Sequence, residues 1–343
     1  MISLIIPSYN NLQHLKNAYI SILKHTPHAE VILLDDGSTD GTWEWIEQQN
    51  CIKYRSETRV GHTILYDKGI ELATNDIVGI LHADMILGPN YIENVLKHLQ
   101  PGRVVCGTRI EPPLHPEGKE KIIKNFGLDF DSLDVNSFEE YCIEVQQKYE
   151  NETTKGMFAP WVIYKKDFQS IGGHDVGFAP FPYEDSDIFQ RWVLAGYDLI
   201  QSRDAFVYHL TCRGHRWNEQ VGKNDDYFTI SEKKAREYYI KKWGSWIKND
   251  EYQHPIIIPV YKKKLILNNS NPQLKEVLEI WFNGGDDIIV EVDGNRFTEQ
   301  DFQYITQLNE IIKNSGEIGE FELGNLKIKI NSLKEYQNDL IKI

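Results

Sequence analysis

Two groups of residues that carry carboxylates each follow directly after a short apolar run. Asp35-Asp36-Gly37-Ser38 comes after residues 31–34, and His82-Ala83-Asp84 comes after residues 77–81. Carboxylate oxygens and an imidazole nitrogen are suitable ligands for a divalent cation, and carboxylates also accept hydrogen bonds from the hydroxyls of a ribose. These residue types therefore favour a site for a ribose and a metal ion, provided that the fold brings both groups together.

The apolar runs before these groups predict strands of a parallel sheet. A short apolar run that ends in turn-forming residues is typical of a strand that is buried on both faces. Strands are predicted over residues 2–6, 31–34, 51–54 and 76–81, and helices over residues 11–25, 39–49 and 61–73. This alternation predicts an α/β fold with a mainly parallel sheet flanked by helices. Ligands of such sheets bind at the carboxyl ends of the strands, so both groups should face one crevice.

The rest of the chain divides into a loop, a last strand and a second domain. Residues 111–118 contain three prolines and a glycine, which predicts a loop, and residues 199–208 contain a strand candidate. Beyond Trp246 the sequence predicts strands over residues 256–260, 265–267, 288–292 and 326–330, and an amphipathic helix over residues 298–313. We therefore expect a first domain over residues 1–249 and a small accessory α+β domain over residues 250–343, in which we recognise no catalytic motif.

The composition weighs against several classes of protein. The 343 residues have a net charge of −14, whereas a protein that binds nucleic acid through its phosphates needs a basic face. No apolar run is long enough for a transmembrane helix, and the amino terminus lacks the features of a signal peptide. The four cysteines are scattered without paired spacing. We expect a cytoplasmic protein with reduced thiols and no integral membrane segment, and a homo-oligomer remains open.

Several motifs in the first two thirds of the chain resemble family 2 glycosyltransferases of the GT-A fold. The matching segments are residues 3–10, 35–38, 82–84, 172–175, 184–187, 195–197 and 205–209, together with Arg191. Their common order carries the resemblance, since each motif alone is weak. The resemblance implies a GT-A nucleotide-diphospho-sugar transferase fold. It also implies an inverting hexosyl- or N-acetylhexosaminyltransferase that moves a sugar from a nucleotide sugar, usually a UDP-sugar, to a hydroxyl of a glycan or another acceptor.

The resemblance assigns the first two motifs and the histidine of the third to the nucleotide-sugar donor. The donor-binding residues are then Pro7, Ser8, Tyr9, Asp35, Asp36 and His82. In the family a carboxylate at the position of Asp36 contacts the base, usually uracil. The alternative interpretation of residues 35–38 is purely structural. Asp, Gly and Ser are common in turns, and Asp and Ser are common as caps of a following helix.

The resemblance also implies a metal site, with one departure from the family pattern. Asp84 matches the usual metal ligand, and His209 stands where several relatives complete the metal site. His82 replaces the first carboxylate of the usual Asp-X-Asp triplet. We expect a divalent metal cofactor. A neutral histidine supplies no negative charge but is a suitable ligand for a transition metal, so Mn²⁺ is favoured over Mg²⁺. His82 and His209 are alternatively ordinary histidines at strand ends.

The acceptor side is assigned to residues further along the chain. Asp185 matches the catalytic base of the family, and Glu184 is expected to contact the acceptor sugar. Trp161 and Tyr183 are candidate platforms on which a sugar ring stacks. Each assignment has a competing explanation, because acidic residues also stabilise a helix amino terminus and tryptophans are more often part of a core.

Two other functions compete with this interpretation. A nucleotidyltransferase acting on a sugar phosphate has a similar sheet, but it normally opens with a glycine-rich basic loop, and residues 7–16 contain no glycine. A non-catalytic protein that binds glycans or nucleotide sugars would keep the fold while its metal site decays. The helix before His82 lacks an Arg-Asn pair that is common in the family, and whether Arg59 or Lys68 substitutes for it is open.

Overall fold

The computed structural model describes residues 1–180, 182–211, 217–218, 223–224, 226–243, 246–257, 264–267, 288–292, 319–323, 326–330 and 341. Contacts within the chain divide it into two compact units, and each is described by itself. The first consists of Met1–Ser231 with Asn249–Pro255, and the second of Glu232–Lys248 with Ile256–Ile343. The predicted division between residues 249 and 250 stays a prediction.

Ten described strands of the first unit form its central sheet. They are β1 (Ile2–Ser8), β2 (Glu30–Asp35), β3 (Ile52–Arg55), β4 (Ile77–Ile80), β5 (Met85–Leu87), β6 (Arg103–Glu111), β7 (Lys121–Ile123), β8 (Thr153–Thr154), β9 (Trp161–Tyr164) and β10 (Asp198–His209). The helices are α1 (Leu12–His25), α2 (Thr42–Glu47), α3 (His62–Leu72), α4 (Tyr91–Leu96), α5 (Val135–Gln146), α6 (Lys165–Ser170) and α7 (Glu184–Leu194), with short 3₁₀ turns η1 (Gln147–Tyr149) and η2 (Val176–Phe178). The α/β class is therefore confirmed.

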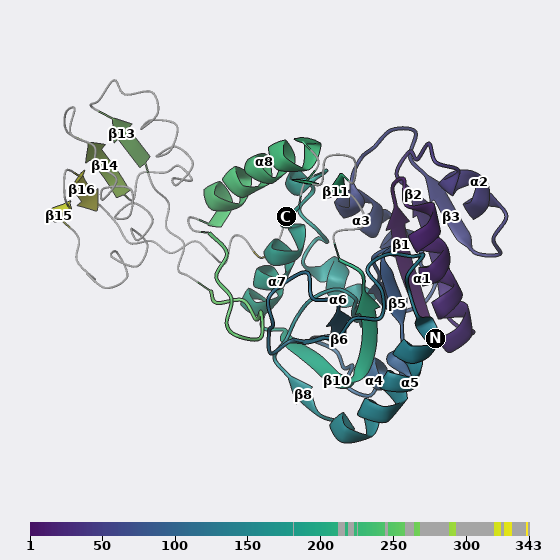
Figure 1. The fold of residues 1–343 in the computed structure, drawn as a ribbon. Coiled ribbons are helices and arrows are strands. Elements are labelled where there is room, and N and C mark those ends of the chain that lie inside the picture. The colour runs from purple at the N-terminus through teal and green to yellow at the C-terminus, as the bar shows by residue number, and fades with distance from the viewer. Residues whose placement is uncertain are drawn as a thin grey trace. The chain divides into compact units, whose positions relative to one another are not determined.

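The first half of the sheet has the predicted parallel arrangement. Its strand order is β3-β2-β1-β4, and all three pairings are parallel. These strands are connected by α1, α2 and α3, which lie beside them in Figure 1. Because the strands run in the same direction, β1 ends at Ser8 and β2 at Asp35 on one edge of the sheet. The sheet thus places the two acidic motifs at a common edge.

The second half of the sheet contains strands that the sequence did not reveal. The order continues β9-β6-β10-β5, and β9 is antiparallel to both β4 and β6. The predicted loop at residues 111–118 begins where β6 ends, but residues 103–111 themselves form a central strand that pairs with β10. The apolar run of β6 is short and is followed by Thr108, Arg109 and Glu111, so it lacks the hydrophobic continuity of a typical buried strand.

Tight packing between α3 and the sheet fixes the wall of the crevice. Gly69 faces Ile5 of β1 and Leu34 of β2, and an added Cβ at Gly69 would lie closer to the Ile5 side chain than any normal contact. The helix therefore approaches the sheet more closely than a larger residue allows. Ile5 and Leu34 are fully buried, which is the usual condition of apolar residues in a two-sided core.

The second unit has a sheet of its own. Its strands β13 (Lys264–Leu267), β14 (Ile288–Val292), β15 (Gly319–Leu323) and β16 (Leu326–Ile330) are ordered β13-β14-β16-β15. The strands predicted over residues 265–267, 288–292 and 326–330 are confirmed. Residues 256–257 are not in a strand, and residues 258–260 and the predicted helix over residues 298–313 lie outside the described residues. Two short strands, β11 (Trp217–Asn218) and β12 (Lys223–Asn224), and helix α8 (Asp226–Trp243) precede this sheet in the chain.

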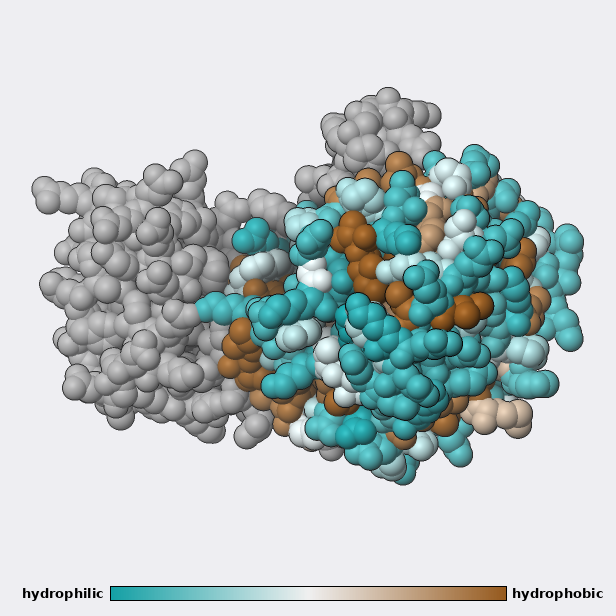
Figure 2. Space-filling view, turned by 60° about the horizontal axis from the view of Figure 1, so that its bottom comes forward, coloured by the Kyte–Doolittle hydropathy of each residue, from teal (hydrophilic) through white to brown (hydrophobic). Residues whose placement is uncertain are grey.

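Figure 2 shows one face of the molecule, and its described part is mainly polar. On the face shown in Figure 2, hydrophilic residues predominate and apolar residues lie between them in small groups. Among the described helices, none has the length and apolar character that crossing a membrane requires. The absence of an integral membrane segment and the cytoplasmic location both stay predictions.

Candidate active site

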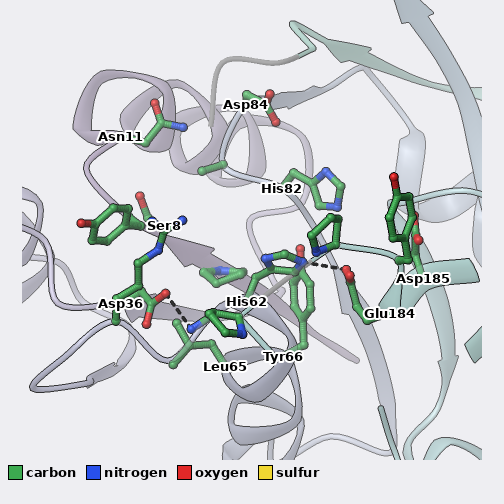
Figure 3. Close-up of a pocket in the computed structure, with 18 of the residues that line it drawn as sticks. Ser8, Asn11, Asp36, His62, Leu65, Tyr66, His82, Asp84, Glu184 and Asp185 are labelled. Carbon is green, nitrogen blue, oxygen red and sulfur yellow. Dashed lines mark hydrogen bonds and ion pairs between the residues drawn. The ribbon is translucent and has the colours of Figure 1, made fainter. Parts of the chain in front are cut away.

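One cavity of the first unit collects most of the residues that the motifs single out (Figure 3). It opens at the carboxyl ends of β1, β2 and β4, as expected for an open α/β sheet. The predicted site residues that line it are Pro7, Ser8, Tyr9, Asp36, His82, Asp84, Tyr183, Glu184, Asp185 and His209. Segments that are far apart in the sequence thus share one wall, and a cavity with a few convergent polar groups is the usual form of a small-molecule site.

Asp36 is held on the cavity wall by two backbone amides. Its carboxylate oxygens accept hydrogen bonds from Val60 N at 2.7 Å and Gly61 N at 2.9 Å. Burial raises the pKa of Asp36, while these two hydrogen bonds oppose the rise. Gly61 has φ +94°, and a Cβ there would lie 2.5 Å from the Cα atom of Pro180. A glycine is therefore required at this place for the loop to approach both Asp36 and Pro180.

The end of β1 and the residue after it contribute a hydroxyl and an aromatic ring to the same cavity. The hydroxyl of Ser8 is buried and has no hydrogen-bond partner among the described residues. A ligand that supplies the missing hydrogen-bond partner would therefore bind more favourably. The guanidinium of Arg59 lies 4.3 Å from the ring centre of Tyr9, so a positive charge lines the cavity next to Asp36. Lys68, the other candidate cation, pairs with Glu71 and does not line the cavity.

Asp35 does not share the position of its neighbour. Its side chain is fully buried and does not line the cavity. The carboxylate accepts hydrogen bonds from Ser38 N at 3.3 Å and pairs with Arg55 at 3.2 Å. The structure therefore contradicts the predicted donor contact of Asp35. Successive side chains of a strand point to opposite faces, so only one of two adjacent aspartates at a strand end can reach a site on one face.

The three predicted ligands of the cation site lie together. One donor atom each of His82, Asp84 and His209 lies within 4.8 Å of the others. Ligand atoms at about 2.0–2.2 Å from one ion are separated by at most about 4.4 Å, so a set of this size is suitable for holding one ion between its members. His209 Nε2 is 3.7 Å from Asp84 Oδ1. The donor set of two imidazoles and one carboxylate fits a divalent transition metal better than Mg²⁺.

Burial keeps His82 in the form that can bind a metal. The low polarity around the ring lowers the pKa of His82 to about 4, although the charge of Asp84 opposes the shift. The ring is therefore neutral at pH 7 and has a lone pair available. It lies edge-on to Phe158 at 6.2 Å and to His209 at 6.0 Å between ring centres.

The amino terminus of α7 presents two acidic residues whose environments differ. His62 Nε2 lies 2.7 Å from Glu184 Oε1, as the dashed line in Figure 3 shows. Although burial alone would raise it, the pKa of Glu184 is lowered to about 2 by the charge and hydrogen bond of His62. Burial, and after it the negative charge of Glu184, raise the pKa of Asp185 to about 6. The pair thus consists of a firmly ionised carboxylate and a basic one.

A buried ion pair fixes the start of α7. Arg191 Nε donates to Asp187 Oδ2 at 2.8 Å, and the same guanidinium donates to the carbonyl oxygens of Ile171 and Gly173. Arg191 and Asp187 are both fully buried. The helix is thereby tied to the glycine-rich turn before it, which positions Glu184 and Asp185 on the cavity wall. Asp187 is committed to this ion pair and does not line the cavity.

The two predicted aromatic platforms have different positions. Tyr183 lines the cavity at the start of α7, with φ +81°. Trp161 is only 1% exposed and packs against Phe168 and Trp192, with ring centres 6.0 and 5.1 Å away. The predicted contact between Trp161 and an acceptor sugar is therefore wrong. A large apolar ring on a central strand gains more from core packing than from exposure.

Sequence reasoning missed several residues that line the cavity. They are Asn11, His62, Leu65, Tyr66, Phe158, Pro180 and Pro182. His62 and Tyr66 occupy one face of α3, where the spacing of four residues is a helical signal, but nothing in the sequence indicates that this face is turned toward the site. Phe158 stands in a short apolar segment without any motif.

Comparison with known proteins shows similarity to glycosyltransferases. Residues 3–168 match the sequence profile described as Glycosyl transferase family 2. Over 236 residues the chain is 24% identical to a validoxylamine A glucosyltransferase from Streptomyces hygroscopicus subsp. jinggangensis; the match covers 60% of this chain and 54% of that protein. The glycosyltransferase GlyG of Streptococcus pneumoniae serotype 4 is 32% identical over 106 residues, which are 29% of this chain and 35% of that protein.

The chain thus spans about half the length of the first of these relatives and about a third of the second. Among solved structures, the chain is similar to GalNAc-T7 crystallised with UDP, GalNAc and Mn²⁺, with 16% identity and a TM-score of 0.47 over 61% of this chain and 43% of that one. Residues 3–168 therefore belong to glycosyl transferase family 2, and they lie in the first unit, whose central sheet and flanking helices form an α/β fold.

Proposed function

We propose that this protein is a metal-dependent, inverting glycosyltransferase that transfers a hexosyl or N-acetylhexosaminyl group from a UDP-sugar to an acceptor hydroxyl. The observation that carries the proposal is the single cavity that joins a nucleoside-type wall, a cation-ligand set and a basic carboxylate. Each of these parts meets one requirement of sugar transfer. The donor must be held, the charge on its leaving diphosphate must be neutralised, and the acceptor hydroxyl must lose a proton.

The donor side is assigned to residues at the ends of β1 and β2 and in the loop after β3. Asp36, oriented by the amides of Val60 and Gly61, is proposed to accept a hydrogen bond from the base. The buried hydroxyl of Ser8 has no partner among the described residues, so it is free to bond to the donor. Arg59, whose guanidinium lies over the ring of Tyr9, adds a positive charge to the same wall of the cavity. This cation can neutralise part of the negative charge of a nucleoside diphosphate.

The cation site is assigned to His82, Asp84 and His209, with Mn²⁺ as the favoured ion. A bound divalent ion would stabilise the negative charge of the leaving diphosphate. Asp84 supplies the negative charge of the site and the two histidines supply neutral nitrogen ligands. This composition supports Mn²⁺ over Mg²⁺, because imidazole ligands suit transition metals and Mg²⁺ prefers oxygen.

The chemical step is assigned to Asp185. The oxygen of the acceptor hydroxyl attacks the anomeric carbon, the bond from that carbon to the diphosphate oxygen breaks, and the hydroxyl proton passes to the Asp185 carboxylate. One attack from the face opposite the leaving group inverts the configuration. Glu184, kept ionised by His62, is proposed to bind acceptor hydroxyls, and Tyr183 to contact the acceptor ring.

The test is a screen of UDP-, GDP- and dTDP-sugars for transfer and for slow hydrolysis, each with Mn²⁺, with Mg²⁺ and with a chelator. We expect turnover with a UDP-sugar and Mn²⁺, and none with the chelator. Binding of a nucleotide sugar without any turnover, across acceptors of several classes, would instead support the alternative of a non-catalytic binding protein. Turnover with a different nucleotide would correct only the assignment of the base.

The activity should depend on pH through Asp185. Because only the ionised carboxylate accepts the proton, kcat/KM should rise as the pH increases through about 6 and level off above it. Glu184→Gln removes the neighbouring negative charge, so the pKa of Asp185 should fall and the rise should move to lower pH. The position of the rise, rather than its height, is the measurement, since the same variant also weakens acceptor contacts. A profile that is flat from pH 5 to 8 would contradict the assignment.

A further inference from the structure

A group of buried charged residues lies directly behind His209 and is not used in the proposed chemistry. Glu111 ends β6, which is paired with β10 so that Ile110 stands beside Tyr208 and Glu111 comes next to His209. On the other side β7 brings Lys121 to the position beside Arg109. Glu111 is only 1% exposed. A buried carboxylate is stable only when its charge and hydrogen-bonding capacity are satisfied, so its partners define what it does.

Both oxygens of Glu111 are occupied. Oε1 accepts from Arg109 Nη1 at 2.6 Å and lies 2.9 Å from Nδ1 of His209, and Oε2 accepts from Lys121 Nζ at 2.9 Å. Two cations at these distances keep the carboxylate ionised. An ionised carboxylate can only accept hydrogen bonds, so the hydrogen in the contact with His209 must be on Nδ1.

This contact decides which ring nitrogen of His209 is free. With the hydrogen on Nδ1, the lone pair is on Nε2, and Nε2 is the nitrogen that faces Asp84 at 3.7 Å. The opposite tautomer would put a hydrogen into the cation site and block the ligand. The contact also fixes the rotation of the ring. The ring centre of Phe158 lies 3.8 Å from the Arg109 guanidinium and 6.0 Å from the centre of the His209 ring, so Phe158 packs beside both residues.

We propose that Glu111 is a positioning residue for the cation site, because it holds His209 in the Nδ1–H tautomer with Nε2 turned toward Asp84 and His82. The proposal rests on the proposed function, which assigns the cation to these three side chains. It also gives the proline-rich loop at residues 112–120 a role. The loop returns the chain so that β7 runs parallel to the end of β6, and so it places Lys121 against the Glu111 carboxylate.

A series of three variants isolates the acceptor oxygen of Glu111. Lys121→Met keeps the carboxylate. Lys121→Met with Glu111→Gln keeps one amide oxygen that can accept from Nδ1–H. Lys121→Met with Glu111→Leu removes the acceptor. Each double variant loses one positive and one negative charge, so the remaining pair of Arg109 and Glu120, 3.3 Å apart, stays balanced. Unfolding temperatures show whether each variant is folded.

The first measurement is direct binding of Mn²⁺ to the full chain in the presence of UDP, followed by electron paramagnetic resonance of the free ion. We expect Lys121→Met and the glutamine variant to bind within a few-fold of the wild type. The leucine variant should bind about 10–100-fold more weakly, the range for loss of such an outer partner. Equal affinity of the leucine variant and Lys121→Met would overturn the inference.

The second measurement is independent of metal and of activity. Nitrogen-15 spectra of the histidine rings, with His209→Gln to assign the signal, distinguish the two neutral tautomers. The metal-free wild type at pH 7.5 should show Nδ1–H for His209, and the leucine variant should lose that preference. A wild type with Nε2–H would overturn the inference even if the leucine variant failed to fold. If the wild type shows Nδ1–H for His209 but binds no Mn²⁺, the proposed metal site is wrong. The conclusion that Glu111 sets the tautomer of His209 would still stand.

Discussion

Asp185→Asn should lower kcat by roughly 10²–10⁴, the usual effect of removing one acid–base group, while the affinity for the donor changes little. The substitution nearly preserves the shape of the side chain but removes the proton acceptor. Burial and the charge of Glu184 raise the pKa of Asp185 to about 6, so the wild-type carboxylate is both ionised and basic near neutral pH. The measurements are initial rates of sugar transfer and calorimetric titration of UDP on the same preparation.

The matched control is Ser186→Ala, one position along α7. Ser186 donates through its backbone amide to Asp185 Oδ1 at 2.6 Å, and its hydroxyl lies 3.3 Å from the same oxygen, so this variant tests the weak side-chain contact alone. We expect a small change in rate. Near wild-type transfer by Asp185→Asn would remove Asp185 from the mechanism. A loss of donor affinity together with transfer would make it part of the donor or cation site instead.

Asp84→Ala should abolish the increase in UDP affinity that Mn²⁺ produces in the wild type. Asp84 is the only carboxylate in the described set of His82, Asp84 and His209, so its removal leaves a cation site without negative charge. The stabilisation of the diphosphate that depends on the ion, on the order of several kcal/mol, should be lost with it. The measurement is a titration of UDP with and without Mn²⁺, in which the metal-free affinity serves as the baseline.

Asp36→Asn is the control that separates the two walls of the cavity. Asp36 is assigned to the nucleoside, so its variant should weaken UDP binding by a similar factor with and without Mn²⁺. The Asp84 variant should weaken it only when Mn²⁺ is present. If Asp84→Ala keeps the full Mn²⁺ effect, the cation is bound elsewhere and the assignment of all three ligands is wrong.

His82 is where the chain departs from the family pattern, and the structure gives the departure a physical explanation. A neutral imidazole replaces a carboxylate without adding a second buried negative charge beside Asp84. Burial lowers the pKa of His82, so the ring remains a ligand at neutral pH. The presence of His82 in place of a carboxylate therefore explains both the expected preference for Mn²⁺ and the expectation that the site remains active.

The sequence by itself determined the class of fold, the parallel half of the sheet and half of the residues that line the cavity. These features follow from local signals, since apolar runs make strands such as residues 2–6 and 31–34, helical spacing makes α1 and α3, and turn residues place Asp36 at a strand end. Ligands of parallel sheets bind at one edge, so the order of the motifs along the chain was enough to bring Asp36 and Asp84 to the same crevice.

Only the tertiary structure decided which side chains face that crevice and what stands behind them. Asp35 and Trp161 have the right residue types, but the alternation of a strand and the demand for core packing turn both away from the cavity. His62, Phe158 and Glu111 carry no motif, and their positions depend on contacts between segments far apart in the chain. Glu111 touches His209 across 98 positions of sequence. Such contacts are set by the register of β6 on β10, which no local pattern of residues specifies.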